Sequence, residues 1–422
     1  MTYLPDTHAV HAGRDDLGEL GVHALPLDFS TTYPLPDLEQ GRDDLARMAQ
    51  GHPPQHSPVY ARLHNPTVGR FENAMAKLES AEAAVAFSTG MAAITAALLA
   101  AQMRGDHVIA LRPLYGGSDH LLNSGLFKLD VTWATTATLK DAIRPSTSLI
   151  MLETPANPTL QMTDIEEVVA IAGDIPVLVD STFATPVLQN PLNHGASMVL
   201  HSATKFLGGH GDVMGGVIAT SENLAQGLRQ IRIATGALLH PMGAYMLHRG
   251  LQTLPARIRT AQSTCEQLAH FLESHTAVKR VFYPGLSDTG LIPNQMRGGG
   301  SMLAFEIEGG FAAAAKVMGT VKMVTPAVSL GSTDTLIQHP AALTHQVVDE
   351  EVRDATGISG SLMRISVGLE DPRDIQADLN HALNLSQRKP KTRPTKTALN
   401  ALFPPVPESP SFEEVNPTAS TA

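Results

Sequence analysis

Two short apolar runs, PVLVDS at residues 176–181 and MVLHSATK at residues 198–205, decide the expected fold. Both read as continuous buried strands, of the kind found where a sheet is covered on both faces. Asp180 stands at the end of the first strand, and Lys205 follows the second one. Because open α/β sheets bind ligands at the carboxyl ends of their strands, both side chains are expected at one ligand-binding edge.

Similar runs surround this pair and alternate with helical patterns, which predicts βαβ units and a mainly parallel sheet in an α/β fold. The further strand candidates are 84–87, 107–111, 131–134, 149–152 and 216–219. From about residue 250 the pattern changes to a long helical stretch at 255–275, strand candidates at 301–307 and 362–367, and a helix at 372–385. We therefore expect a second, smaller α+β domain.

The chain is predicted to divide into four parts: an N-terminal arm (1–60), an α/β domain (61–250), a C-terminal α+β domain (251–386) and a disordered tail (387–422). Prolines punctuate the arm, so it is expected to be irregular and either to wrap another surface or to be loosely ordered. An arm that clasps a partner favours a homo-oligomer. The tail holds seven of the 29 prolines, with basic residues first and acidic ones later, which is typical of disorder.

Composition excludes several classes of protein. Hydrophobic residues make up 43% of the 422 residues, an ordinary globular balance, and the net charge of −11 argues against a nucleic-acid partner. The most apolar stretch, 91–103, is too short to cross a bilayer, so no membrane association is expected. The N-terminus shows no signal-peptide pattern, and a single cysteine fits a reducing compartment, so a cytoplasmic location is expected. Cys265 lies in an amphipathic pattern, which favours a packing or surface role over a nucleophilic one.

Asp180 and Lys205 suit the chemistry of pyridoxal 5'-phosphate (PLP). A lysine amine forms the imine with the PLP aldehyde, and a carboxylate keeps the pyridine nitrogen protonated so that the ring accepts electrons. Ser202 and Thr204 flank the lysine, and their hydroxyls suit a phosphate. Taken singly, such an aspartate is more often a helix cap or turn residue and such a lysine is more often solvated, so the hypothesis depends on their combination.

A second motif supports that combination. Ser88-Thr89-Gly90-Met91 leads from a strand candidate into a helix, and backbone N–H groups at a helix N-terminus bind phosphate. Gly90 lets the backbone approach a ligand closely. The alternative is an ordinary helix capped by Ser88 or Thr89.

Other candidates are less specific. Tyr115 follows a predicted strand, where its ring suits stacking on a planar cofactor and its hydroxyl suits proton transfer, although a core tyrosine fits the pattern equally well. Arg364 lies in a strand pattern and suits either a substrate carboxylate or a structural ion pair. Tyr60 and Arg62 lie in the arm and are good phosphate donors, but the pattern does not show where the arm runs.

The segment HSATKFLGGHGD at 201–212 resembles the cofactor-lysine signature of the Cys/Met metabolism family of PLP enzymes. The similarity runs from about residue 8 to residue 386. Ser197 departs from the family, which usually has Asp or Gln there. The resemblance implies an aspartate-aminotransferase-type fold (PLP fold type I), usually assembled as a homotetramer of two catalytic dimers.

The resemblance also implies residue roles. Lys205 would carry PLP and move protons, Asp180 would pair with the pyridine nitrogen, and Tyr115 would stack on the ring. The positions matching the family's cofactor contacts are Tyr60, Arg62, Gly90, Met91, Tyr115, Asp180, Ser202, Thr204 and Lys205. Tyr60 and Arg62 would reach the phosphate of a neighbouring subunit. The positions matching its substrate contacts are Asn157, Ser329, Thr344 and Arg364. No metal is expected.

Within the family, the runs 327–331 (AVSLG) and 334–341 (DTLIQHPA) resemble the methionine γ-lyases. Val328 suits a small thioether better than the polar distal end of cystathionine. Gly117 and Arg232-Ile233 depart from that branch. The expected reaction is α,γ-elimination of L-methionine, a small sulfur amino acid, to methanethiol, 2-oxobutanoate and ammonia. The alternatives are a cystathionine γ-lyase or O-acetylhomoserine sulfhydrylase on the same scaffold, and, from a different class, a catalytically inactive binding protein.

Overall fold

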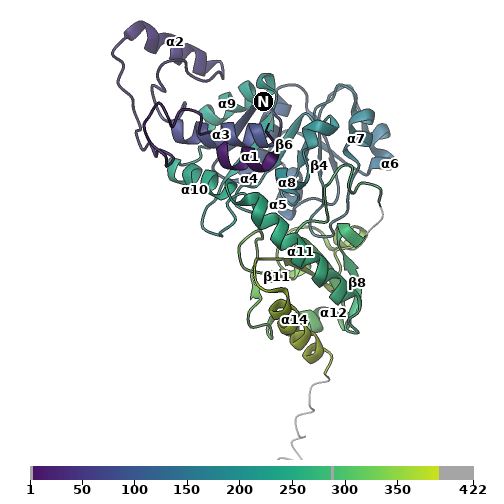
Figure 1. Cartoon of the computed structure of the whole chain (residues 1–422). Coiled ribbons are helices and arrows are strands. Elements are labelled where there is room, and N and C mark those ends of the chain that lie inside the picture. Colours follow the sequence, from purple (N-terminus) through teal and green to yellow (C-terminus); the bar gives the residue numbers. More distant parts are fainter. Residues whose placement is uncertain (1–2, 287–288, 389–422) are drawn as a thin grey trace, which may run out of the picture. The chain divides into compact units, whose positions relative to one another are not determined.

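The larger of two sheets has seven strands in the order β1-β7-β6-β5-β4-β2-β3. The computed structural model describes residues 3–286 and 289–388 (Figure 1). The strands are β1 Ala83–Phe87, β2 His107–Leu111, β3 Asp130–Ala134, β4 Thr147–Glu153, β5 Val177–Asp180, β6 Met198–His201 and β7 Gly216–Thr220. β7 runs antiparallel to β1 and β6, and the other neighbouring pairs are parallel. The predicted α/β class with a mainly parallel sheet is confirmed.

Helices cover both faces of this sheet. Successive residues of a strand point to opposite faces, so each strand contributes side chains to two cores. In β1, Val85 and Phe87 belong to the core that includes residues of α4 and α9, whereas Ala84 and Ala86 belong to the core that includes residues of α3. The helices of this region are α3 Pro66–Leu78, α4 Gly90–Gln102, α5 Gly116–Asn123, α6 Thr136–Ala142, α7 Ile165–Ala172, α8 Thr185–Leu188, α9 Glu222–Thr235 and α10 Pro241–Leu251. The continuous apolar character of the strands thus follows from double coverage.

The smaller sheet has five strands in the order β10-β11-β12-β9-β8. They are β8 Val278–Phe282, β9 Met302–Ile307, β10 Thr325–Pro326, β11 Leu336–Gln338 and β12 Leu362–Ser366. The helices here are α11 Leu254–Glu273, α12 Gly310–Met318, α13 Glu350–Ala355 and α14 Pro372–Ser386. Figure 1 shows the long α11 running beside β8, with α12 next to α14. Cys265 is fully buried in α11, as a packing residue is.

The N-terminal arm differs from the expectation of an irregular segment, because it contains two helices, α1 Pro5–His11 and α2 Leu38–Ala49. Asp37 begins α2 by accepting hydrogen bonds from the backbone N–H groups of Glu39 (2.9 Å) and Gln40 (3.0 Å), which satisfies two of the four unpaired donors of a helix start. The many prolines of the arm led to the expectation of an irregular segment, although Asp37 is a typical helix-capping residue.

The predicted domain boundaries stay predictions; residues 1–387 cluster into one unit. Most of the predicted tail, from residue 389 onward, lies outside the described residues. Among the helices that the structure describes, none is long and apolar enough to cross a bilayer.

Candidate active site

Eleven of the thirteen candidate residues line one cavity of about 510 Å³ at the carboxyl edge of the larger sheet. They are Gly90, Met91, Tyr115, Asn157, Asp180, Ser202, Thr204, Lys205, Ser329, Thr344 and Arg364. Asp180 is the last residue of β5, and Lys205 follows β6 by four residues. These adjacent parallel strands bring the acid and the amine to the same edge, as the two sequence runs predicted.

The amine of Lys205 is held inside the cavity. Its Nζ donates a hydrogen bond to Oγ of Ser329 at 2.7 Å. Burial, together with the positive charge of Arg364, lowers the pKa of Lys205 to about 8. A lysine with so low a pKa is partly neutral near neutral pH, and the neutral amine is the form that attacks a carbonyl carbon.

The turn that carries Ser329 is pressed against the lysine backbone. Ser329 has φ +81°, in the left-handed region where a residue other than glycine is strained by about 1–3 kcal/mol. Its carbonyl accepts a hydrogen bond from Nη2 of Arg364 at 2.8 Å. Gly331, at φ +80°, has no room for a side chain, because a Cβ atom there would lie 2.5 Å from the backbone nitrogen of Phe206. Strain and close approach together place the Ser329 hydroxyl at the amine.

Asp180 is a buried residue, and in the described part of the chain only one of its two carboxylate oxygens accepts hydrogen bonds. Its Oδ1 accepts hydrogen bonds from the Thr182 backbone N–H (3.0 Å) and from the Thr182 hydroxyl (2.6 Å). Among the described residues no donor reaches Oδ2. Burial raises the pKa of Asp180, and the Thr182 hydrogen bonds oppose that rise. A carboxylate oxygen without a donor, on a residue that lines the cavity, fits the protonated ring nitrogen of PLP.

The start of α4 forms a cradle at the same edge. Thr89 is its N-cap, with Oγ1 accepting from the Ala92 N–H at 3.0 Å. A Cβ atom on Gly90 would lie 3.0 Å from the Oγ of Ser202, closer than ordinary Cβ contacts, so glycine favours the close approach of the helix start to that hydroxyl. Helix N-termini with free N–H groups bind phosphate, and the cap and the phosphate interpretations are therefore compatible. Thr204 also lines the cavity, but its hydroxyl bonds to Gly215 at 3.0 and 3.3 Å.

Arg364, on β12, is fully buried and anchors the other end of the cavity. Its Nη1 donates to Oδ1 of Asn157 at 2.7 Å. With its amide oxygen turned toward the guanidinium, Gln338 accepts from Nη2 at 2.8 Å and from the Thr344 hydroxyl at 3.2 Å. Burial lowers the pKa of Arg364 to about 10, although nearby Glu153 opposes this. An arginine held by neutral acceptors keeps its charge available for a carboxylate.

Tyr60 and Arg62 do not line this cavity. They line a separate hollow of about 360 Å³, and Nη1 of Arg62 donates to the backbone carbonyl of Ile233 at 3.0 Å. In this chain alone they are therefore apart from Lys205, and their role at a neighbouring subunit stays a prediction.

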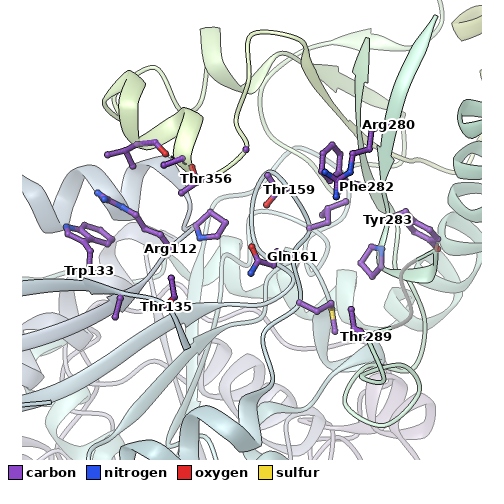
Figure 2. A pocket seen from close by; sticks show the side chains of 18 of the residues that line it. Arg112, Trp133, Thr135, Thr159, Gln161, Arg280, Phe282, Tyr283, Thr289 and Thr356 are labelled. Carbon is purple, nitrogen blue, oxygen red and sulfur yellow. Dashed lines mark hydrogen bonds between the residues drawn. The ribbon is translucent and has the colours of Figure 1, made fainter. Parts of the chain in front are cut away.

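A larger cavity of about 820 Å³ lies elsewhere (Figure 2). Its two arginines already have ring partners: the guanidinium of Arg112 lies 3.6 Å from the centre of the Trp133 ring and that of Arg280 lies 4.5 Å from the centre of the Phe282 ring. Arg112 also pairs with Asp119 at 2.7 Å. No lysine is among the described residues that line this cavity, so the chemistry is assigned to the smaller one.

Three residues of the site escaped sequence reasoning as functional groups: Glu153, Thr182 and Gln338. Glu153 ends β4, opposite Asp180 in the register of β5, so its place at a strand end was an available signal. Thr182 follows Asp180 by two residues, the usual spacing for an aspartate that bonds its own backbone. Gln338 had no local signal, because its role depends on Arg364, its partner on the neighbouring strand β12. No group of three potential metal ligands occurs in the described parts of the chain.

The fold and this constellation together define an α/β enzyme of the PLP-dependent class. The sequence profile of the family described as Cys/Met metabolism PLP-dependent enzyme matches residues 6–384. The chain belongs to this family, and it is therefore a PLP-dependent enzyme.

Individual relatives agree over nearly the whole chain. A protein of Brevibacterium sandarakinum named L-methionine gamma-lyase is 54% identical over 389 residues, covering 91% of this chain and 98% of the relative. One of Streptomyces avermitilis with the same name is 52% identical, covering 93% of each chain. Among solved structures, cystathionine gamma synthase from Xanthomonas oryzae pv. oryzae in complex with cystathionine matches with a TM-score of 0.85 and 35% identity, covering 92% of this chain and 99% of the other. The predicted PLP fold type I is confirmed by these neighbours.

Proposed function

We propose that this chain is a carbon–sulfur lyase that catalyses α,γ-elimination of L-methionine: methionine and water give methanethiol, 2-oxobutanoate and ammonia. The observation that carries the proposal is an identity of 52–54%, over more than nine tenths of the chain, with proteins named L-methionine gamma-lyase. Apolar side chains of the cavity, Met91, Met214 and Val328, suit a thioether.

Bound PLP supplies an aldehyde that reacts with amines and a ring that accepts electrons. Lys205 is the amine proposed to hold it and, once free, to take the proton from Cα of the substrate and then move a proton at Cβ. Asp180 would keep the ring nitrogen protonated. The N–H groups of Gly90 and Met91 and the hydroxyls of Ser202 and Thr204 would bind the phosphate.

The substrate is oriented from the other end of the cavity. Arg364 binds its carboxylate through two N–H groups, with Asn157 and Ser329 beside it and Thr344 supporting through Gln338. Tyr115, which lines the same cavity, would stack on the ring and donate the proton that the departing thiolate needs.

The assembly is proposed to be a homotetramer of two catalytic dimers, in which Tyr60 and Arg62 reach the phosphate of the neighbouring subunit. Large apolar side chains of the arm are exposed in the single chain, where Phe29, Leu35, Leu38 and Leu45 are 44–82% exposed. Such exposure supports the proposal that a neighbouring subunit covers the arm. A cytoplasmic location is proposed because the sequence holds one cysteine, and that one is buried.

The test is a substrate panel on purified holoenzyme: methionine, cystathionine, homocysteine, and O-acetylhomoserine with sulfide. We expect rapid methanethiol release from methionine with little turnover of cystathionine. Faster turnover of cystathionine, or net replacement of acetate by sulfide, would assign the chain to one of the other reactions of the family.

A further inference from the structure

The carboxylate of Glu153 joins the two ends of the active-site cavity. It lies at the end of β4, lines the cavity and is only 6% exposed. Its Oε2 accepts the backbone N–H of Tyr115 at 2.6 Å, and its Oε1 accepts the backbone N–H of Asn157 at 3.0 Å. One buried side chain thus holds the backbones of two residues that are 42 positions apart in the sequence.

Each of these two backbones carries a group with a task in the cavity. Oδ1 of Asn157 accepts a hydrogen bond from Nη1 of Arg364 at 2.7 Å, and the carbonyl of Ser329 accepts one from Nη2 of Arg364 at 2.8 Å. Ser329 in turn receives Nζ of Lys205. A continuous series of hydrogen bonds therefore runs from the Tyr115 backbone through Glu153 to the lysine.

The place of Tyr115 makes the Glu153 contact important. Tyr115 is the N-cap of α5, its side chain makes no capping hydrogen bond, and the residue as a whole is 39% exposed in this chain. The next residue, Gly116, packs so closely on the Thr344 carbonyl that a Cβ atom would lie 2.3 Å from that oxygen. The backbone at Tyr115 is thus fixed by Glu153 on one side and by close packing on the other.

Glu153 stands opposite Asp180 in the register of β4 and β5, so two buried carboxylates lie on neighbouring strands. Burial and the charge of Asp180 raise the pKa of Glu153, while the two N–H groups that it accepts oppose that rise. The positive charge of Arg364 also favours the ionised form of Glu153. Burying a carboxyl group costs free energy unless its oxygens are hydrogen-bonded, and here both oxygens bond to the protein backbone.

We propose that Glu153 is a positioning residue for the reaction: by accepting both backbone N–H groups it sets the Tyr115 ring and aligns Asn157 and Arg364 for the substrate carboxylate. Both oxygens of Glu153 already accept backbone N–H groups, so the residue acts through Tyr115 and Asn157 rather than through a contact of its own with the substrate. The inference rests on the proposed function for the identity of the substrate, but its test does not need turnover.

The test compares two ligands that differ in the carboxylate. L-Norleucine has the shape and charge of methionine but no sulfur leaving group, and 3-(methylthio)propylamine has the thioether and amine but no carboxylate. Dissociation constants for both are measured from the change in visible absorption of the holoenzyme. In Glu153→Gln the amide nitrogen cannot accept, so one backbone N–H loses its partner.

We expect Glu153→Gln to raise the dissociation constant of L-norleucine by up to about tenfold, the size of effect that the loss of one buried hydrogen bond produces. The constant for 3-(methylthio)propylamine should change by no more than about twofold, and kcat for methionine should fall as well because Tyr115 is released. The control is Asp378→Asn, which removes a carboxylate that accepts backbone N–H groups of Lys322, Met323 and Val324 away from the cavity. It should change neither constant.

Equal weakening of both ligands, or no weakening of L-norleucine, would overturn the proposal. If Glu153→Gln does not fold, Glu153→Asp replaces it: the shorter carboxylate cannot span both N–H groups, and the same selective loss is expected. The two proposals can fail separately. If the wild-type protein releases no methanethiol from methionine, the proposed reaction is wrong. If Glu153→Gln nevertheless lowers the affinity for L-norleucine alone, the positioning role of Glu153 still holds.

Discussion

The two ends of the cavity are built differently. The end proposed to hold the cofactor, with Gly90, Met91, Asp180, Ser202, Thr204 and Lys205, comes from the edge of the larger sheet. The end proposed to bind the substrate, with Asn157, Ser329, Thr344 and Arg364, joins a loop after β4 to the smaller sheet. The first depends on short local motifs at strand ends, and the second on contacts between residues up to 207 positions apart. A cofactor end can therefore be shared by a family while the substrate end varies.

The largest expected effect is at the cofactor end. Lys205→Ala should abolish the visible absorption of the holoenzyme and lower kcat by at least about 10⁴-fold, because both the attachment group and the proton carrier are lost. Absorption spectra and methanethiol release measure this. Ser329→Ala is the matched control: it removes the hydroxyl that bonds Nζ but should keep the visible band. An unchanged spectrum in Lys205→Ala would refute the assignment of both ends.

Asp180→Asn should lower kcat by roughly 10²–10⁴-fold, because an amide cannot supply the negative charge that holds the ring nitrogen protonated. Thr182→Val is the comparison, since it removes a hydroxyl bonded to Oδ1 but keeps the carboxylate, and a loss of about tenfold or less is expected. Similar kinetics for both variants would show that the charge of Asp180 is not what the site uses.

Arg364→Lys should leave the visible spectrum in place and raise KM for methionine, lowering kcat/KM by roughly 10²-fold, because an ammonium cannot bind a carboxylate with two parallel N–H groups. Steady-state kinetics with spectra taken in parallel measure this. Arg373→Ala, on the exposed first turn of α14, should be neutral. A spectral loss in Arg364→Lys as large as that of Lys205→Ala would break the distinction between the two ends.

The smallest effect expected is on pH dependence. The pKa of Lys205 is lowered to about 8, so the neutral amine increases as pH rises through that value. The rate at which apoenzyme regains PLP should therefore rise about tenfold between pH 7 and pH 9 and then level off. Stopped-flow absorbance measures it. A midpoint near the ordinary lysine value would contradict the lowering by burial and Arg364.

Much of the cofactor end was predictable because each signal is local. A buried apolar run ends in Asp180, a second is followed by Ser202, Thr204 and Lys205, and Gly90 opens a helix after a strand. The helix α2 of the arm was missed because the neighbouring prolines suggested an irregular segment and the cap at Asp37 was overlooked. Glu153 ends a buried strand, a local signal that was available but not used, and its contact with the Tyr115 backbone spans 38 positions. Gln338 was missed because its partner Arg364 lies on the neighbouring strand, where sequence spacing gives no indication of distance.

Short stretches of residues carry the class of the fold, the lysine and aspartate at neighbouring strand ends, and the glycine at the helix start, because backbone propensity and strand burial are local properties. The closing of the cavity is set only in the folded chain, where Ser329 meets Lys205, Arg364 reaches Asn157, and Glu153 contacts the backbones of Tyr115 and Asn157. These contacts depend on the packing of distant segments, which local pattern does not encode.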